Sequence, residues 1–473
     1  MSRHDKSGCS RRLLGLVTAL ALAGCTTFSE ERGFDLTRRT AAERVGGDAV
    51  WIRTEQEAGE IRKKVDGLLA RPLSADDAVQ VALYNNAGLQ AAYADLGISE
   101  SDLVAAGRLE NPRFSFTRVI NSHQEVKIES VLAFGVMSLI TLPGRIEAAG
   151  RRFEAVQRSV AAEMLRVAGD ARRAWVMAVA AQETAIYMEQ VKDSADAGAE
   201  LARRMARAGN FSRLSQLREH AFYADATTQV ARARNAALAS REKLARMLGV
   251  ADASMLKLPQ RLPDLPGSPR VEDDVAVDAM RERLDVTAAR LESESLAASL
   301  GLTRITRFTN VLEVGRARVD EGTEPRKRGW DVGFEIPLFD WGGARVAGAQ
   351  ARYLQSVSRI RETAVNAQSE VREAYATYRT QYDLARHTRD EIVPLRKKIS
   401  EEMLWRYNGM LKSVFELLAD AREQVLAVNS AIEAQRDFWL AEADLRTALV
   451  GKPTTLGLAA PLMPKAAGGG GGH

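Results

Sequence analysis

The chain repeats one order of elements in its two halves. The turn Gly209-Asn210-Phe211-Ser212 joins two long helical patterns, and Gly409-Met410-Leu411-Lys412-Ser413 does the same about 200 residues later. In each half, residues of alternating polarity precede the longer helix and predict a pair of β-strands. Neither half can bury its apolar helical faces alone, so we expect the repeats to pack on each other or on further copies of the chain.

The N-terminal residues have the organisation of an export signal. Residues 1–12 are basic, and residues 13–23 form an apolar run that is too short to span a bilayer. The sequence Leu22-Ala23-Gly24-Cys25 that follows is typical of a lipobox. We therefore predict a lipoprotein signal peptide over residues 1–24 and lipidation of Cys25, with an ordinary signal peptide and a coincidental cysteine as the alternative.

The composition of the mature chain excludes several classes of protein. Once Cys9 has left with the signal, the acylated Cys25 is the only cysteine, so no disulfide or thiol chemistry remains. The signal removes a net charge of three from the +4 of the full chain, and no run of Lys and Arg indicates nucleic-acid binding. No uncharged apolar run of about 18 residues follows Cys25, so a mature chain that spans a membrane must do so with strands.

The pattern divides the mature chain into five segments. Residues 25–72 are polar and weakly patterned, and we interpret them as a lipid-anchored leader with helical pieces near residues 61–69. The remaining segments are the first repeat over residues 73–258, a Pro-rich linker over residues 259–272, the second repeat over residues 273–451 and a flexible tail over residues 452–473.

Two pairs of strands are predicted, one in each repeat. The two strands of the first pair and the last strand each have one apolar and one more polar parity, and therefore an apolar face and a polar face. In the first pair the apolar parity is interrupted by Arg118. The predicted strands cover residues 114–120, 126–140, 303–319 and 330–338, with a charged loop over residues 320–328.

Helices fill the rest of both repeats. Ser74 is a suitable N-cap for the first helix, Gly249 is a suitable C-cap for the helix that follows the first turn, and Pro394 should kink a later one. The predicted helices include residues 74–110, 145–207, 214–248, 274–300 and 344–406. The last of these has a heptad seam typical of a coiled coil: Val357, Ala364, Val371, Tyr378, Ala385, Ile392 and Ile399.

The number of strands favours an oligomer. Open sheet edges are too costly in a bilayer, and four strands cannot close on themselves. Two chains would supply eight strands, whose side chains fill the interior, whereas three would supply twelve and leave a lumen. The predicted fold class is thus mainly α with a small β part. It is a duplicated helix, strand, strand, long helix, helix repeat that forms a long coiled-coil α-barrel, and its four strands per chain contribute to a trimeric twelve-strand β-barrel.

The sequence contains no pattern of catalytic or metal-binding residues. The histidines are dispersed and lack metal-ligand spacing, and neither a phosphate-binding loop nor a nucleophile elbow is present. We therefore predict no enzymatic activity, no cofactor and no metal. Met403 and Met410 lie near one tip and are interpreted as packing or contact residues rather than soft-metal ligands.

Several motifs together resemble a known family. Leu73-Ser74-Ala75-Asp76-Asp77-Ala78 leads to Ala82-Leu83-Tyr84-Asn85-Asn86-Ala87-Gly88-Leu89, Ala106-Gly107-Arg108-Leu109-Glu110-Asn111-Pro112 enters the first strand, and Ile336-Pro337-Leu338-Phe339-Asp340-Trp341-Gly342-Gly343 leaves the fourth. With the two turns, these motifs cover about residues 74–450. The chain resembles the TolC family of outer-membrane efflux proteins, in particular its lipid-anchored branch.

The resemblance implies a homotrimer that serves as a passive exit duct. Such a duct would take substrate from an inner-membrane pump through a periplasmic adaptor (membrane fusion protein), with the strands in outer-membrane lipid and the helices forming a periplasmic tunnel. Thr26, rather than Asp, after the acylated cysteine is compatible with the outer membrane of a Gram-negative bacterium. The cargo classes considered are heavy-metal ions and drugs. The alternative is a non-channel periplasmic helical adaptor or scaffold lipoprotein.

The resemblance also implies that the two helical turns, called the tips here, contact the adaptor and form the gate. Met410 stands where the family pattern places Gly, three residues before Ser413, which raises the hypothesis that the second tip bends differently. Nearby acids, Glu401, Glu402, Glu416 and Asp420, are interpreted as surface charge. The predicted tip residues are Gly209, Asn210, Phe211, Ser212, Leu214, Tyr407, Asn408, Gly409, Met410, Leu411 and Ser413.

Overall fold

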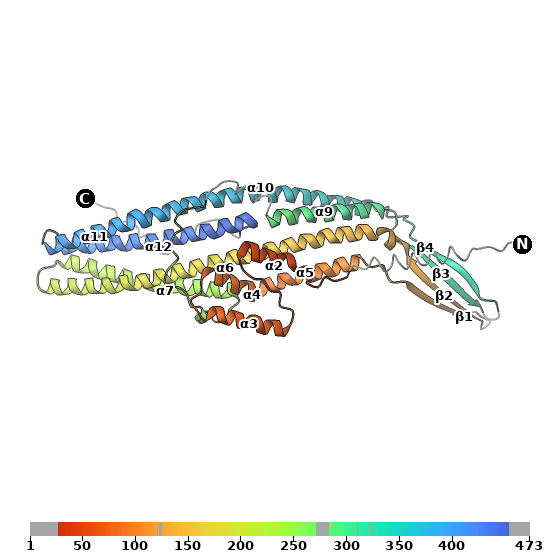
Figure 1. Cartoon of the computed structure of the whole chain (residues 1–473), viewed down its shortest axis with the longest axis horizontal. Helices are drawn as coiled ribbons and strands as arrows, with labels where there is room; N and C mark the ends of the chain where they lie inside the picture. The colour runs from red at the N-terminus through yellow and green to blue at the C-terminus, as the bar shows by residue number, and fades with distance from the viewer. Residues whose placement is uncertain are drawn as a thin grey trace. The chain divides into compact units, whose positions relative to one another are not determined.

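The computed structural model describes residues 27–120, 122, 125–270, 283–309, 311–321 and 324–453. The predictions for the signal peptide, Cys25, residues 274–282 and most of the C-terminal tail lie outside these residues. The chain forms two compact units (Figure 1). Unit 1 consists of Met1–Leu36, Ala92–Val160 and Leu284–Val365, and unit 2 consists of Thr37–Ala91, Ala161–Arg283 and Asn366–His473.

Unit 1 contains one antiparallel sheet of four strands (Figure 1). The strands pair in the order β1-β2-β3-β4, so both predicted hairpins are formed and β2 joins β3 across the repeats. On their outer sides, β1 and β4 pair with no strand in the described part of the chain. The strands are β1 (Arg113–Ile120), β2 (Val126–Gly135), β3 (Leu312–Glu321) and β4 (Lys327–Phe334).

The pairing register places the apolar parities of all four strands on one face. Phe114 lies opposite Leu132, which lies opposite Arg316, which lies opposite Trp330. Because side chains alternate between faces along a strand, every second residue from these positions shares their face. We call this surface the apolar face and the opposite one the polar face.

The second predicted strand is too long. It was expected to reach residue 140, but helix α6 (Val136–Arg207) begins directly after β2 and contains Pro143. The carbonyl groups near this proline have side-chain donors, since Thr141 Oγ1 donates to Met137 O and Arg145 Nη2 donates to Ser138 O. These bonds stabilise a helical turn that the alternating pattern did not reveal.

The strand boundaries of the second repeat also differ from the prediction. Helix α9 (Leu284–Ile305) includes residues 303–305, which were assigned to a strand, and β4 ends at Phe334 rather than at residue 338. Thr303 and Thr306 donate their hydroxyl protons to carbonyl groups of the last helical turn, at Ser299 and Leu302, and so extend the helical hydrogen bonding at that end.

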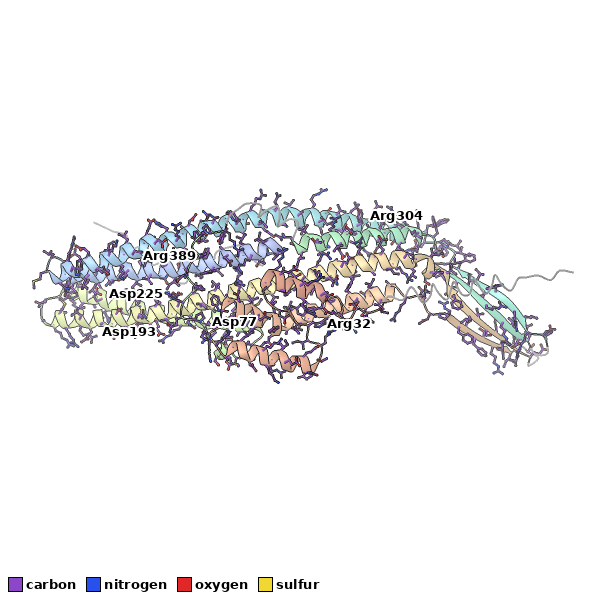
Figure 2. The ribbon with its side chains drawn as sticks, in the orientation of Figure 1. Arg32, Asp77, Asp193, Asp225, Arg304 and Arg389 are labelled. Atoms are coloured by element: carbon purple, nitrogen blue, oxygen red, sulfur yellow. The ribbon has the colours of Figure 1, made fainter. Side chains whose placement is uncertain are left out.

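The leader in unit 1 is docked rather than free. Arg32 (Figure 2) and Gly33 both have positive φ and form a tight turn, in which Phe34 N donates to Glu31 O. Phe34 is buried and meets Tyr93 edge-on at 4.9 Å between ring centroids. The buried Glu100 carboxylate accepts hydrogen bonds from the backbone N–H and the hydroxyl of Ser29. These contacts hold residues 29–34 against α5 (Ala87–Ala106).

Unit 2 is helical in the part of the chain that the structure describes. Its core lies along the long helices, whose Ala-rich faces allow close approach. Its elements, some of which continue into unit 1, are α2 (Asp35–Thr40), a π-helical turn Ala41–Val45, α3 (Glu55–Leu69), α4 (Ala75–Asn85), α5, α6, α7 (Arg213–Leu248), a 3-10 turn Ala253–Met255, α10 (Gly343–His387), a π-helical turn Thr388–Ile392, α11 (Val393–Asn408) and α12 (Val414–Val450).

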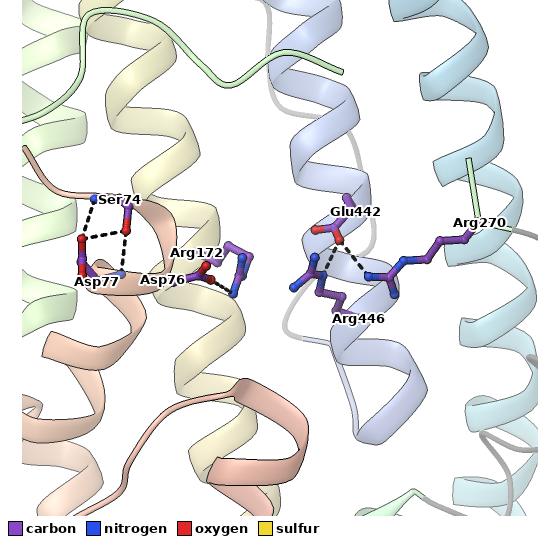
Figure 3. A network of polar contacts seen from close by, with 7 residues as sticks. All are labelled: Ser74, Asp76, Asp77, Arg172, Arg270, Glu442 and Arg446. Carbon is purple, nitrogen blue, oxygen red and sulfur yellow. Dashed lines mark hydrogen bonds and ion pairs between the residues drawn. The ribbon is translucent and has the colours of Figure 1, made fainter. Parts of the chain in front are cut away.

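The predicted helix caps are confirmed. Ser74 accepts a hydrogen bond from Asp77 N while Asp77 accepts one from Ser74 N, which makes a capping box at the start of α4 (Figure 3). Gly249 ends α7 with φ of 68°. A Cβ atom at this position would also lie 2.3 Å from the carbonyl oxygen of Asn85, so both conformation and space favour glycine there.

The heptad seam of α10 is buried over its middle part. Val371, Tyr378 and Ala385 are each at most 3% exposed and pack with Phe438 of α12. Phe438 lies 5.7 Å from the ring centroid of Tyr378 and is fully buried. The lower seam residues Ile392 and Ile399 are exposed in a single chain, so only the centre of the predicted seam is an internal core.

A π-helical turn lies near Pro394, at the place where a kink was predicted. The turn covers Thr388–Ile392 and lies immediately before α11, where Pro394 occupies a first-turn position. A proline has no N–H for the carbonyl four residues earlier, and a wider turn is one way for the backbone to absorb that loss.

Charged side chains on the helices of unit 2 form short networks. Arg172 of α6 donates to Asp76 of α4 at 2.7 Å, and Glu442 of α12 accepts from both Arg446 and Arg270 (Figure 3). The Pro-rich linker is held by hydrogen bonds, because the Tyr382 hydroxyl donates to the carbonyl groups of Pro266 and Gly267.

Among the described residues, no helix is both long enough and apolar enough to cross a membrane.

Candidate coupling tips and sheet surface

The first tip, in unit 2, closes α6 with a glycine in the left-handed conformation. Gly209 has φ of 79°. Its N–H donates to Ala206 O, and the N–H of Asn210 donates to Met205 O, which is the pair of bonds that defines a Schellman motif. Ser212 then accepts a hydrogen bond from Ser215 N and starts α7.

The second tip repeats this geometry with a different residue in the left-handed position. Met410 has φ of 58°, its N–H donates to Tyr407 O, and the N–H of Leu411 donates to Arg406 O. Gly409 has an ordinary φ of −79°. Ser413 caps α12 through a capping box with Glu416.

The hypothesis of a different bend at the second tip is therefore wrong. At both tips the left-handed residue stands three positions before the serine that caps the next helix, and both tips make the same two Schellman bonds. Spacing from the capping serine decides the turn more strongly than the identity of the residue. The chain accepts a methionine where glycine would be less strained.

A small apolar core joins the two tips. Phe211 of the first tip and Val414 of the second are buried together with Ala202, and the half-buried Tyr407 packs against them. The remaining predicted tip residues are exposed: Gly209, Asn210, Ser212, Leu214, Asn408, Gly409, Met410, Leu411 and Ser413. The structure thus brings the two turns together and leaves most of their side chains free for contact.

Near the second tip, the sequence analysis misjudged the exposure of one residue and did not identify another. Asp420 is only 8% exposed, so its interpretation as surface charge is wrong, and its Oδ2 atom has no hydrogen-bond partner among the described residues. Trp405 is 71% exposed and adds to an apolar surface with Met410 and Leu411, which are 93% and 76% exposed. The sequence signal that could have revealed this apolar surface was a tryptophan one helical turn before the second tip.

The capping carboxylate of the second tip is held in its charged form. A hydrogen bond from the Lys412 ammonium group and another from Ser413 N–H lower the pKa of Glu416. The first tip has no carboxylate in the same role, because Ser212 is paired with Ser215. The two tips therefore share a backbone geometry, but only the second has a titratable carboxylate in its helix cap.

The two faces of the sheet in unit 1 differ in their exposed side chains. On the polar face, Arg113 pairs with Glu313 at 3.1 Å, and Glu321 pairs with both Lys127 and Lys327. On the apolar face, large apolar side chains are exposed: Phe114, Phe116, Leu132, Phe134, Trp330, Val332 and Phe334. A surface of this size requires cover by lipid or protein.

The described residues contain no cluster of three or more His, Cys, Asp or Glu side chains that could hold a metal ion. Neither the tips nor the sheet therefore offers an evident centre for bound-metal chemistry in the described ranges. What these surfaces can do is bind other molecules: the tips through exposed backbone turns and apolar side chains, and the sheet through its apolar face.

Comparison with known protein families gives one match. Residues 275–451 match the family described as outer membrane efflux protein. The chain therefore carries an outer membrane efflux protein domain. The match covers the second repeat, from just before α9 to the end of α12, and so includes the second tip and the strands β3 and β4.

Three solved structures of membrane proteins are similar to this chain in fold. The outer membrane protein VceC of Vibrio cholerae is 16% identical, with a TM-score of 0.67 over 79% of this chain and 95% of that one. The MtrE outer membrane channel of Neisseria gonorrhoeae is 17% identical, with a TM-score of 0.65 over 79% of this chain and 88% of that one. CusC, described as forming a transmembrane channel, is 16% identical, with a TM-score of 0.65 over 80% and 92%. No curated protein matches the sequence at a significant level.

Proposed function

We propose that this protein is the outer-membrane exit duct of a tripartite efflux system, in which it passively conducts substrate delivered by an inner-membrane pump and a periplasmic adaptor. The observation that carries the proposal is the match of residues 275–451 to the outer membrane efflux proteins, on a chain whose sheet exposes many large apolar side chains on one face. Passive conduction fits a sequence without a nucleotide-binding loop.

A homotrimer accounts for the free edges of the sheet. The outer sides of β1 and β4 have no strand partner within the described part of one chain. Three copies would pair β4 of one chain with β1 of the next, which leaves no unsatisfied backbone groups in lipid. The apolar face would then lie against lipid, and the polar face, with its paired charges, would line the lumen.

The tips are the proposed contact with the adaptor. Their two turns share the core of Phe211 and Val414 and present exposed side chains at the same end of unit 2. The exposed Trp405, Met410 and Leu411 would supply the apolar part of that contact. Heavy-metal ions and drugs remain the proposed cargo classes, and the pump is expected to choose between them.

The decisive experiment is single-channel conductance of the detergent-extracted protein in a planar bilayer, with the oligomer mass measured on the same preparation. A conducting trimer is the expected result. A monomer without conductance would support the second candidate, a helical adaptor or scaffold lipoprotein, and would overturn the exit duct.

The lipid anchor is proposed separately, on the sequence around Cys25. Cys25→Ser should abolish incorporation of a radioactive fatty acid into the protein while export continues. Persistent labelling of the Cys25→Ser variant would contradict the anchor and leave the duct proposal intact.

A further inference from the structure

Four arginines lie on the apolar face: Arg118, Arg318 and Arg328 near the end of the sheet that holds the strand-connecting loops, and Arg316 one row further from that end. Arg118 is on β1, Arg316 and Arg318 are on β3, and Arg328 is on β4. The register places Phe116, Ser130, Arg318 and Arg328 in one row across the sheet. The rows toward the other end hold apolar residues, such as Val332 opposite Val314 and Phe334 opposite Leu312.

These arginines have no acidic partners among the described residues. Arg118, Arg318 and Arg328 are exposed and form no ion pair there, and Arg316 lies over the ring of Trp330 at 5.5 Å. Asp320, which shares this face, is already paired with Arg326 at 3.0 Å. On the polar face of the same sheet, by contrast, Arg113, Lys127 and Lys327 all have carboxylate partners.

The pair Arg318 and Arg328 is unfavourable without a ligand. The two residues are direct cross-strand partners, and like charges in that position destabilise a sheet. A guanidinium group on a face that meets lipid is also costly unless it reaches an interface with anionic groups. The arrangement therefore favours a negatively charged partner outside the chain.

We propose that these four arginines bind the phosphate groups of an anionic glycolipid in the outer leaflet, that is, of lipopolysaccharide. The inference rests on the proposed function, because it needs the apolar face to lie in an outer membrane with the strand-connecting loops outward. Arginine suits this ligand, since its planar guanidinium donates two parallel hydrogen bonds to a phosphate. In a trimer, Arg328 on edge strand β4 would also approach Arg118 on β1 of the next copy, which makes the basic surface continuous.

The test uses the full-length trimer in detergent and bisphosphorylated lipid A as the probe, with binding measured by native mass spectrometry. The variant Arg318→Gln with Arg328→Gln should bind lipid A about tenfold or more weakly, because two charge-assisted contacts are lost. The matched control, Arg359→Gln with Arg361→Gln, removes two exposed arginines from α10 in the same unit and should bind like the wild type. Lipid A without phosphates should bind the wild type as weakly as phosphorylated lipid A binds the double variant.

Three outcomes would overturn the proposal. The first is that the double variant and the control bind lipid A with equal affinity. The second is that the wild type binds phosphate-free lipid A as well as it binds phosphorylated lipid A. The third is that millimolar inorganic phosphate displaces lipid A, which would indicate an adventitious anion only. If the double variant did not assemble, Arg118→Gln, which lies opposite the neutral Ile128, would decide by the same binding measurement. Conductance of the wild type distinguishes the two proposals. If the wild-type trimer conducts but the double variant binds lipid A as well as the wild type does, the glycolipid site alone is refuted.

Discussion

At the scale of single residues, the two tips show how spacing can override residue type. Both turns use the same Schellman bonds, yet one places glycine and the other methionine in the left-handed position. The difference lies in strain rather than in shape. A side chain with positive φ costs roughly 1–2 kcal/mol, which Met410 bears and Gly209 avoids. The exposed thioether of Met410 gains little from burial in the isolated chain, so its contribution is expected in a complex.

Replacing Met410 by glycine should tighten the second tip. Met410→Gly should stabilise the turn by about 1 kcal/mol, because glycine adopts φ of 58° without steric cost. The measurement is hydrogen exchange of the Leu411 amide, which donates to Arg406 O and should exchange about fivefold more slowly. Gly409→Ala is the control: its φ is ordinary and its nearest contact would be 3.4 Å, so exchange should change little. Faster exchange in Met410→Gly would refute the strain argument.

At the scale of elements, capping chemistry gives the second tip a dependence on pH that the first lacks. A carboxylate with a lowered pKa stabilises the fold at pH values above its unfolded pKa, near pH 4, and loses that contribution as the pH falls through the lowered value. Glu416 is such a group, and it closes the capping box that starts α12. Ser212 and Ser215 at the first tip do not titrate in this range.

Acidification should therefore loosen the second tip alone. A spin label at residue 411 should become more mobile as the pH falls from 6 to 3, whereas a label at residue 210 should report little change. Glu416→Gln should make the label at residue 411 mobile at both pH values, because the amide forms no ion pair with Lys412. Equal mobility changes at the two tips would contradict the assignment to Glu416.

The centre of the sheet leaves no room for a larger residue at Gly315. A Cβ atom at Gly315 would lie 2.9 Å from Leu132 O and 3.0 Å from Ala133 Cα, so β2 and β3 could not keep their pairing. Gly315→Val should cost about 2–3 kcal/mol per chain and strongly reduce the yield of assembled trimer. Gly329→Val is the matched control, because no atom lies within 4 Å of its added Cβ. Trimer yields from mass measurement should separate the two variants, and equal yields would refute the predicted clash.

At the scale of the whole molecule, the tips are expected to couple the duct to its partners. Leu214→Lys should lower cargo resistance in cells toward that of a strain without the protein, while the trimer remains intact. Leu214 is 60% exposed, so a lysine there should not disturb the fold. Leu238→Lys, at a site on the same helix that is 58% exposed but far along the sequence from the tip, should leave resistance unchanged. Unchanged resistance in Leu214→Lys would count against the tip as the contact.

The sequence by itself determined the type and order of most elements of this protein. Periodicity distinguished strands from helices because side chains repeat every two residues in one and every 3.6 in the other. Local chemistry placed Ser74 as an N-cap and Gly249 as a C-cap, since each depends on neighbours within a few residues. A resemblance to outer-membrane efflux proteins was also readable from motifs along the chain, and residues 275–451 match that family.

Only the tertiary structure decided which elements meet. The pairing of β2 with β3 joins residues nearly 200 positions apart, and no local pattern encodes that register. Burial of Asp420 and the docking of Phe34 against Tyr93 depend on neighbours supplied by other helices. The four arginines of the apolar face illustrate the same point: one of them interrupted a pattern in the sequence, but long-range pairing was needed to place all four on one surface. Such contacts are set by packing between distant segments, which the order of residues along one segment does not specify.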